Sequence, residues 1–122
     1  MIKREIWVTT SFEAMHKWVD CPYEDVTFLR SLHRHIFHVK VWCVVNHSDR
    51  DIEFIRLKRY LCDYIGNRFS RQNLGNMSCE TIAENILRYL NGLAYKVEVS
   101  EDGENGAIVE NVDEDKLPKN AA

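Results

Sequence analysis

Three of the five histidines in this sequence have a spacing that could bind a metal ion. His33 and His35 are two residues apart in an alternating segment, so on a β-strand their side chains leave the same face, with β-carbons about 6–7 Å apart. His16 ends an earlier β-rich segment. If the two segments pair antiparallel through residues 17–32, His16 lies beside the other two. A catalytic zinc ion usually has three protein ligands and an open fourth position, so this set predicts a zinc site.

The other two histidines are not expected to join this group. His38 points to the opposite face of the strand, and His47 follows its far end. A purely structural zinc site is an alternative for the same three ligands, although structural zinc is usually held by four protein ligands.

Composition predicts one ordinary globular domain. The chain has 122 residues, of which 45% are hydrophobic and 29% charged, with a formal net charge of -3. These values give no electrostatic reason to expect nucleic acid. No apolar stretch is long enough for a signal peptide or a membrane span, so we expect a cytoplasmic location and no membrane. Residues 1–112 are expected to form the domain, and residues 113–122 a flexible tail.

The order of predicted elements is β, β, α, α, β, β. The first strand covers residues 2–11 and extends toward residue 16, and the second covers residues 33–45. The first helix is capped by Asp49 or Asp51 and ends near residues 66–67, and the second follows Ser78 and ends at residues 91–92. Residues 93–99 and 107–112 form a terminal hairpin. This order implies an α+β fold with a four-stranded antiparallel sheet, both helices on one face, and edges that favour a homo-oligomer.

Several motifs resemble the family of 6-pyruvoyl-tetrahydropterin and 6-carboxy-tetrahydropterin synthases. Residues 12–16 (F-E-A-M-H) and 32–35 (L-H-R-H) are similar to the family's F-x-A-x-H and L-H-G-H motifs. Residues 78–83 (S-C-E-T-I-A) resemble its T-x-E-x-x-A motif, and residues 99–101 (V-S-E) resemble the end of its late strand. The resemblance implies a T-fold that assembles as trimers, usually paired into hexamers, with active sites at subunit interfaces.

The resemblance also implies roles for individual residues. His16, His33 and His35 would bind zinc. Glu101 would accept hydrogen bonds from the amino-pyrimidine edge of a pterin or purine-like ring, because a carboxylate can accept two adjacent N–H donors. Ser78 would line the same pocket.

The sequence departs from the family at the catalytic residues. The family's nucleophilic cysteine precedes the H-x-H pair, but residues 27–32 contain neither a thiol nor a carboxylate. The family's catalytic aspartate and histidine align with Ser70 and Arg71, and an arginine stays protonated near neutral pH. Arg34 replaces the glycine between the two histidines.

The long connection before the second strand contains the remaining candidates for catalysis. Cys21 is a candidate to fold over the metal, and Glu24 and Asp25 are candidates for a carboxylate base. The other three cysteines, at positions 43, 62 and 79, lack the paired spacing of a thiolate zinc site and are expected to be packing residues.

The resemblance implies a zinc-dependent carbon–oxygen lyase of the tetrahydropterin synthase type. Its substrate would be a dihydropterin triphosphate or a related compound, in a queuosine or biopterin-type pathway. The missing catalytic residues leave an alternative, a metal-containing protein that binds a pterin or purine-like ring without synthase activity.

Overall fold

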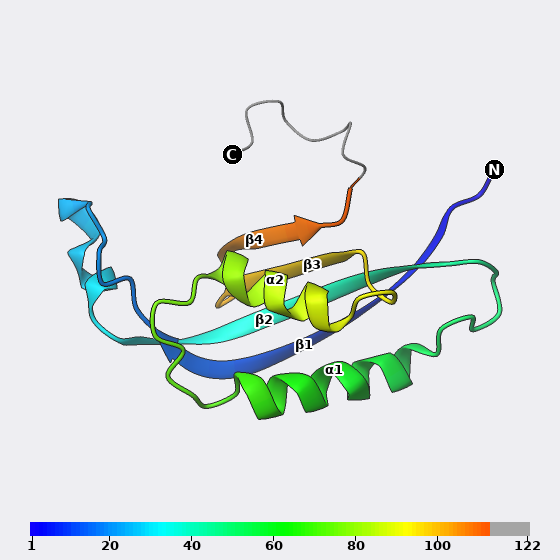
Figure 1. The fold of residues 1–122 in the computed structure, drawn as a ribbon, viewed down its shortest axis with the longest axis horizontal. Helices are drawn as coiled ribbons and strands as arrows, with labels where there is room; N and C mark the ends of the chain where they lie inside the picture. The colour runs from blue at the N-terminus through cyan, green and yellow to red at the C-terminus, as the bar shows by residue number, and fades with distance from the viewer. Residues whose placement is uncertain (113–122) are drawn as a thin grey trace.

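The computed structural model describes residues 1–112, and the tail predicted for residues 113–122 lies outside this range. The elements follow the predicted order (Figure 1) and confirm the α+β fold. The strands are β1 (Arg4–His16), β2 (His33–Val45), β3 (Lys96–Glu101) and β4 (Asn105–Glu110), and the helices are α1 (Phe54–Arg68) and α2 (Cys79–Tyr89). A short 3₁₀ segment, Glu24–Arg30, interrupts the connection between β1 and β2 and was not predicted.

The four strands form one antiparallel sheet in the order β1-β2-β3-β4. β1 and β2 pair over their whole length, from Arg4 opposite Val45 to His16 opposite His33. β3 lies on the other side of β2 and ends with Glu101 opposite Phe37. This register brings the end of β1, the start of β2 and the end of β3 together at one end of the sheet.

Both helices cover one face of the sheet, as predicted (Figure 1). α1 packs over β1, and α2 packs over β3 and β4. The buried residues of β2 alternate along the strand because every second side chain faces the helices. They are Phe37, Val39, Val41, Cys43 and Val45. None of the helices in residues 1–112 is long and apolar enough to cross a membrane.

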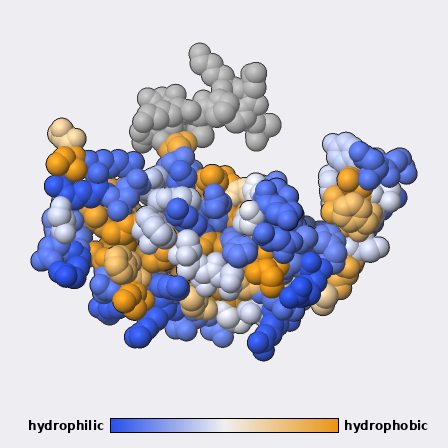
Figure 2. Space-filling model, turned by 180° about the vertical axis from the view of Figure 1, so that it is seen from behind, coloured by the Kyte–Doolittle hydropathy of each residue, from blue (hydrophilic) through white to orange (hydrophobic). Residues whose placement is uncertain are grey.

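The opposite face of the sheet carries a mixture of apolar and polar side chains (Figure 2). Trp7 of β1 lies directly opposite Trp42 of β2. The Nζ atom of Lys40 lies 4.5 Å from the ring centroid of Trp7 and 4.9 Å from that of Trp42. These cation–π contacts cover part of the exposed aromatic surface.

Side-chain caps fix where the two helices begin. Ser78 caps α2 as predicted, since its Oγ accepts a hydrogen bond from the amide of Thr81 at 3.1 Å. The predicted cap of α1 was wrong. Neither Asp49 nor Asp51 caps the helix, because the chain turns before it starts and Glu53 accepts from the amide of Ile55 at 2.7 Å.

The segment between the helices lies along the edge of β1. The amide of Arg71 donates to the carbonyl of Glu13 at 2.6 Å, that of Met15 to Gln72 at 3.0 Å, and that of Lys17 to Gly75 at 2.9 Å. Residues 71–75 therefore act as a short extra strand beside the last part of β1. This pairing fixes the residues that lead into α2 next to His16.

Candidate metal centre and adjoining cavity

The structure brings His16, His33 and His35 together, and it adds Glu101 to the group. One potential ligand atom from each of these four residues lies within 4.8 Å of the others. His16 and His33 are paired across β1 and β2, and His35 is two residues further along the same face. Glu101 reaches the group from the end of β3. The sheet register therefore assembles four metal-binding side chains from three strands.

The Nδ1 atom of each of the three histidines lies within hydrogen-bonding distance of an oxygen acceptor. The Nδ1 atom of His16 lies 2.9 Å from the carbonyl oxygen of Met77, and that of His33 lies 2.8 Å from the carbonyl oxygen of Ser31. His35 Nδ1 lies 2.7 Å from Oδ2 of Asp102. Because a carbonyl oxygen or a carboxylate only accepts, each Nδ1 donates its hydrogen. The Nε2 atoms of the neutral rings are then left with free lone pairs, as in metal-bound histidines.

The donor set fits a divalent cation. The Nε2 atom of His33 is buried without a hydrogen-bond partner, and that of His16 is buried with the carboxylate of Glu101 as its near polar neighbour. Oε2 of Glu101 lies 2.7 Å from His16 Nε2 and 3.1 Å from His35 Nε2. At these distances a carboxylate oxygen repels the lone pair of a neutral ring nitrogen unless a proton or a metal ion lies between them. A single divalent cation would remove the repulsion for all the donors together.

A layer of stacked phenylalanine rings from the hydrophobic core packs against the histidine cluster. The ring of Phe37 lies 5.2 Å from that of His16 and 5.8 Å from that of His35, measured between centroids. Phe37 stacks on Phe12 at 5.2 Å, and Phe12 stacks on Phe69 at 5.8 Å. The imidazoles therefore rest on the packed core, which restricts their rotation.

A cavity of about 460 Å³ adjoins the cluster, and His16, His33 and Glu101 form part of its wall. Ser78 lines this cavity, together with Lys17, Trp18, Asn76 and Cys79. Trp18 is 43% exposed, so its ring offers an aromatic surface at this site. The cavity therefore combines a candidate metal centre with aromatic, amide and hydroxyl groups, the mixture typical of small-molecule sites.

Cys79 is the thiol of this cavity, and it is in its protonated form near neutral pH. Burial raises its pKa to about 12, and the nearby carboxylates of Glu101 and Glu80 add to this effect. A protonated thiol is a poor nucleophile. Cys79 therefore does not replace the family's nucleophilic cysteine in the arrangement described here.

The candidates from the long connection do not line the cavity. Cys21 is buried, with its Sγ 3.9 Å from the carbonyl oxygen of Val26. Glu24 is exposed and lies 3.8 Å from Arg30, and Asp25 is exposed too. Glu24 and Asp25 lie in the 3₁₀ segment, which the sequence pattern did not reveal and which contributes Leu29 to the wall of the cavity.

The residues that replace the family's catalytic pair and its glycine are also outside the cavity wall. Ser70 and Arg71 do not contribute to it, since Arg71 is held at the edge of β1. Arg34 forms two contacts of 2.9 Å with the carboxylate of Glu13. This pair, on the face away from the histidines, lowers the pKa of Glu13 through the hydrogen bond and charge of Arg34. The positive charge of Arg34 is therefore paired with the carboxylate of Glu13, outside the site.

Sequence reasoning missed Asp102, Cys79 and Asn105. Residues 101–106 were interpreted as a turn, whereas β3 continues to Glu101 and β4 begins at Asn105. Asp102 is therefore the first residue after β3. The hydrogen bond from His35 holds the pKa of Asp102 below its usual range. An acidic residue next to the family-like Glu101 was the available signal, but turn residues are so often acidic that it did not stand out.

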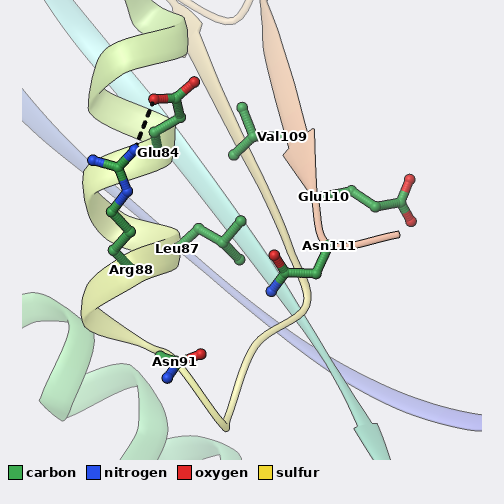
Figure 3. A pocket seen from close by; sticks show the side chains of 7 residues that line it. All are labelled: Glu84, Leu87, Arg88, Asn91, Val109, Glu110 and Asn111. Atoms are coloured by element: carbon green, nitrogen blue, oxygen red, sulfur yellow. Dashed lines mark ion pairs between the residues drawn. The ribbon is translucent and has the colours of Figure 1, made fainter. Parts of the chain in front are cut away.

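A second cavity, of about 690 Å³, lies between α2 and β4 (Figure 3). Its wall includes Leu87, Val109 and an ion pair between Arg88 and Glu84 at 3.6 Å. It contains none of the predicted site residues. It lies beside the outer edge of β4, away from the candidate metal centre.

No family profile and no curated protein sequence matches this chain. Solved structures with a similar fold include the following two. One is 6-pyruvoyl tetrahydropterin synthase from Caenorhabditis elegans, with a TM-score of 0.73 and 18% identity over 92% of this chain and 98% of that chain. The other is an uncharacterised protein from Wolinella succinogenes, with a TM-score of 0.77 and 14% identity over 92% of this chain and 100% of that chain. The chain therefore has the fold of a 6-pyruvoyl tetrahydropterin synthase.

Proposed function

We propose that this protein is a divergent, zinc-dependent enzyme of the tetrahydropterin synthase type. Its substrate is a dihydropterin triphosphate or a related compound, and the reaction is that of a carbon–oxygen lyase. The observation that carries the proposal is the convergence of three histidine Nε2 atoms whose Nδ1 atoms all donate to acceptors. The similarity in fold to the Caenorhabditis elegans synthase is the reason for proposing a reaction of the tetrahydropterin synthase type at this centre.

His16, His33 and His35 would hold the zinc ion, with Glu101 close enough to be a fourth ligand. When bound, zinc would act as a Lewis acid on hydroxyl or carbonyl oxygens of the substrate. Ser78 and Glu101 are proposed to bind the ring of the ligand. A ligand ring that donates hydrogen bonds to the carboxylate of Glu101 would draw this carboxylate away from His16 and His35. The metal would then have a ligand position available for the substrate side chain.

The direct test combines metal analysis with a turnover assay. Purified protein should contain close to one zinc ion per chain and should convert 7,8-dihydroneopterin triphosphate. His33→Ala should lose both the zinc and the turnover. His38→Ala is a matched control, because His38 lies on the same strand but faces away. A His16→Ala protein that is free of metal yet assembles and binds ligand normally would contradict the metal proposal.

The alternative function, ring binding without synthase activity, is favoured by the state of Cys79. Among residues 1–112, it is the thiol that lines the cavity, and its pKa of about 12 keeps it protonated. This reading predicts no turnover, but saturable binding of a pterin or purine that is weakened in Glu101→Ala. Calorimetric titration with zinc-loaded protein separates the two functions.

We also propose that the protein is a homo-oligomer, a trimer or a hexamer. Within residues 1–112, the outer edges of β4 and of β1 before Glu13 have no strand partner. An apolar groove of about 520 Å³ runs beside the β1 edge, with Trp7, Phe54 and Ile55 each more than half exposed. Unpaired edges next to exposed apolar side chains favour strand pairing between subunits.

A further inference from the structure

The hydrogen bonds of the three histidines are not equivalent. His16 and His33 donate to neutral carbonyl oxygens, whereas His35 donates to the carboxylate of Asp102 at 2.7 Å. A hydrogen bond to a charged acceptor is roughly twice as strong as one between neutral groups. His35 is therefore the ligand whose electron-donating strength depends most on its partner.

Asp102 is held in place by contacts with the residue next to His35. Its backbone amide donates to the carbonyl of Ile36 at 2.7 Å, and its Oδ1 accepts from the amide of Ile36 at 3.0 Å. Its φ angle is +56°, a conformation that aspartate and asparagine tolerate better than most residues. These contacts leave Oδ2 facing the ring of His35. Asp102 thus clamps the end of β3 to the start of β2 beside the histidine.

The arrangement also balances charge. The carboxylates of Glu101 and Asp102 can together carry two negative charges, which match one divalent cation. The side chain of Asp102 is 46% exposed, so water screens part of its field. Its effect on the metal should therefore act mainly through the hydrogen bond to His35.

From this geometry we infer that Asp102 is a positioning residue for the metal centre, which fixes the tautomer and orientation of His35 and strengthens its donation to the metal. The inference rests on the proposed function in so far as it assumes that the cluster binds zinc. The competing interpretation is that Asp102 only completes the turn between β3 and β4.

Asp102→Asn separates these interpretations. An asparagine can keep the hydrogen bond from Ile36 and the positive φ, so the turn should form and the metal-free protein should keep its urea midpoint. Its amide nitrogen, however, would replace Oδ2 and donate to His35 Nδ1. The ring would then carry its hydrogen on Nε2, where the metal should bind.

We expect Asp102→Asn to weaken zinc binding by about tenfold to a hundredfold, measured by competition with a chromophoric chelator. Glu104→Gln is the matched control, since it removes the same charge from the same exposed turn without touching a histidine. It should bind zinc like the wild type. An affinity of Asp102→Asn equal to that of the control would overturn the inference.

A second measurement does not require the metal. The ¹⁵N resonances of the histidine rings in metal-free protein should show His35 with its hydrogen on Nδ1 in the wild type and on Nε2 in Asp102→Asn. An unchanged ring in the variant would overturn the role of Asp102. If the wild type takes up no zinc, the proposed function fails, while this comparison still decides whether Asp102 controls the tautomer of His35.

Discussion

Phe37 connects the hydrophobic core to the candidate metal centre. Its side chain is fully buried, and its ring contacts both His16 and His35 while stacking on Phe12. The same residue lies opposite Glu101 in the sheet. The position of three of the four potential ligands therefore depends on one aromatic side chain. If the cluster binds zinc as proposed, the packing of this side chain would couple stability to metal binding.

Truncation of this ring should show the coupling. Phe37→Ala is expected to lower the free energy of unfolding by about 3–5 kcal/mol, because it leaves a cavity in the core. Urea unfolding with a chelator present measures this change. Phe37→Leu, a smaller perturbation, should still fold and should bind zinc more weakly than the wild type. Phe28→Ala is the control, since Phe28 is 67% exposed and should change stability by less than about 0.5 kcal/mol.

The buried thiol of Cys43 gives the protein a defined response to alkaline pH. Burial raises the pKa of Cys43 from 9.0 to about 11. Between these values the unfolded chain loses the proton and the folded chain keeps it, so the free energy of unfolding falls as the pH rises. Urea unfolding at pH 8–11 should show a steeper decline for the wild type than for Cys43→Ala. Equal slopes would contradict the assignment, and Cys62→Ala is the control for removal of a cysteine.

The hairpin of β3 and β4 carries both acidic residues of the site, and its geometry depends on a glycine. A Cβ atom at Gly106 would lie 2.6 Å from the Cα atom of Ser100 and would also clash with the carbonyl oxygen of Val99. Only glycine permits this close approach of the two strands. Since Glu101 ends β3, any shift of the hairpin moves its carboxylate relative to the histidines.

Gly106→Ala should therefore lower the free energy of unfolding by about 1–3 kcal/mol and weaken zinc binding. Gly66→Ala is the matched control, because Gly66 lies within α1 and has open space around its Cα atom. That change should raise the free energy of unfolding by about 1 kcal/mol. Thermal unfolding and chelator competition measure both effects. A Gly106→Ala protein with normal zinc affinity would show that the hairpin does not position Glu101.

The elements with a clear periodicity could be predicted from sequence, and the connections could not. Strict alternation in residues 33–45 identified β2 with its correct ends and placed His33 and His35 on its buried face. Pairing of β1 with β2 then implied the position of His16. Residues 17–32 lack a period, and part of this connection is held by contacts with distant segments, such as the hydrogen bond from the amide of Val19 to Oδ1 of Asn76. The partners of the histidine Nδ1 atoms come from such connections, so they were not predictable.

At the scale of the whole molecule, the sheet has two strand edges that no other strand within residues 1–112 pairs along their full length, and their surroundings differ. The β1 edge is flanked by an apolar groove that includes Glu5 and Lys58, and the cavity beside β4 includes Glu110 and the ion pair between Glu84 and Arg88 (Figure 3). Unpaired strand edges would allow β1 in one copy to pair with β4 in another. Such head-to-tail contacts close into rings when the rotation between subunits allows it.

Phe54→Glu should disrupt this assembly. Phe54 is 51% exposed at the β1 groove and begins α1, where an acidic side chain suits the helix dipole, so the subunit should still fold. Light scattering coupled to size-exclusion chromatography should show a shift from trimer or hexamer to monomer. Phe28→Glu, at an exposed position outside both edges, should leave the mass unchanged. A wild-type monomer at micromolar concentration would contradict the assembly proposal.

The segment that lies along the end of β1 has a consequence for the geometry of any such ring. Because residues 71–75 occupy the edge of β1 from Glu13 onward, an incoming strand can pair only with residues 4–12. Each subunit must then be displaced along the strand direction relative to the next one, and in a closed sheet this stagger fixes the tilt of the strands and the width of the ring. The connection that places the carbonyl of Met77 beside His16 would thus also limit the diameter of such a ring.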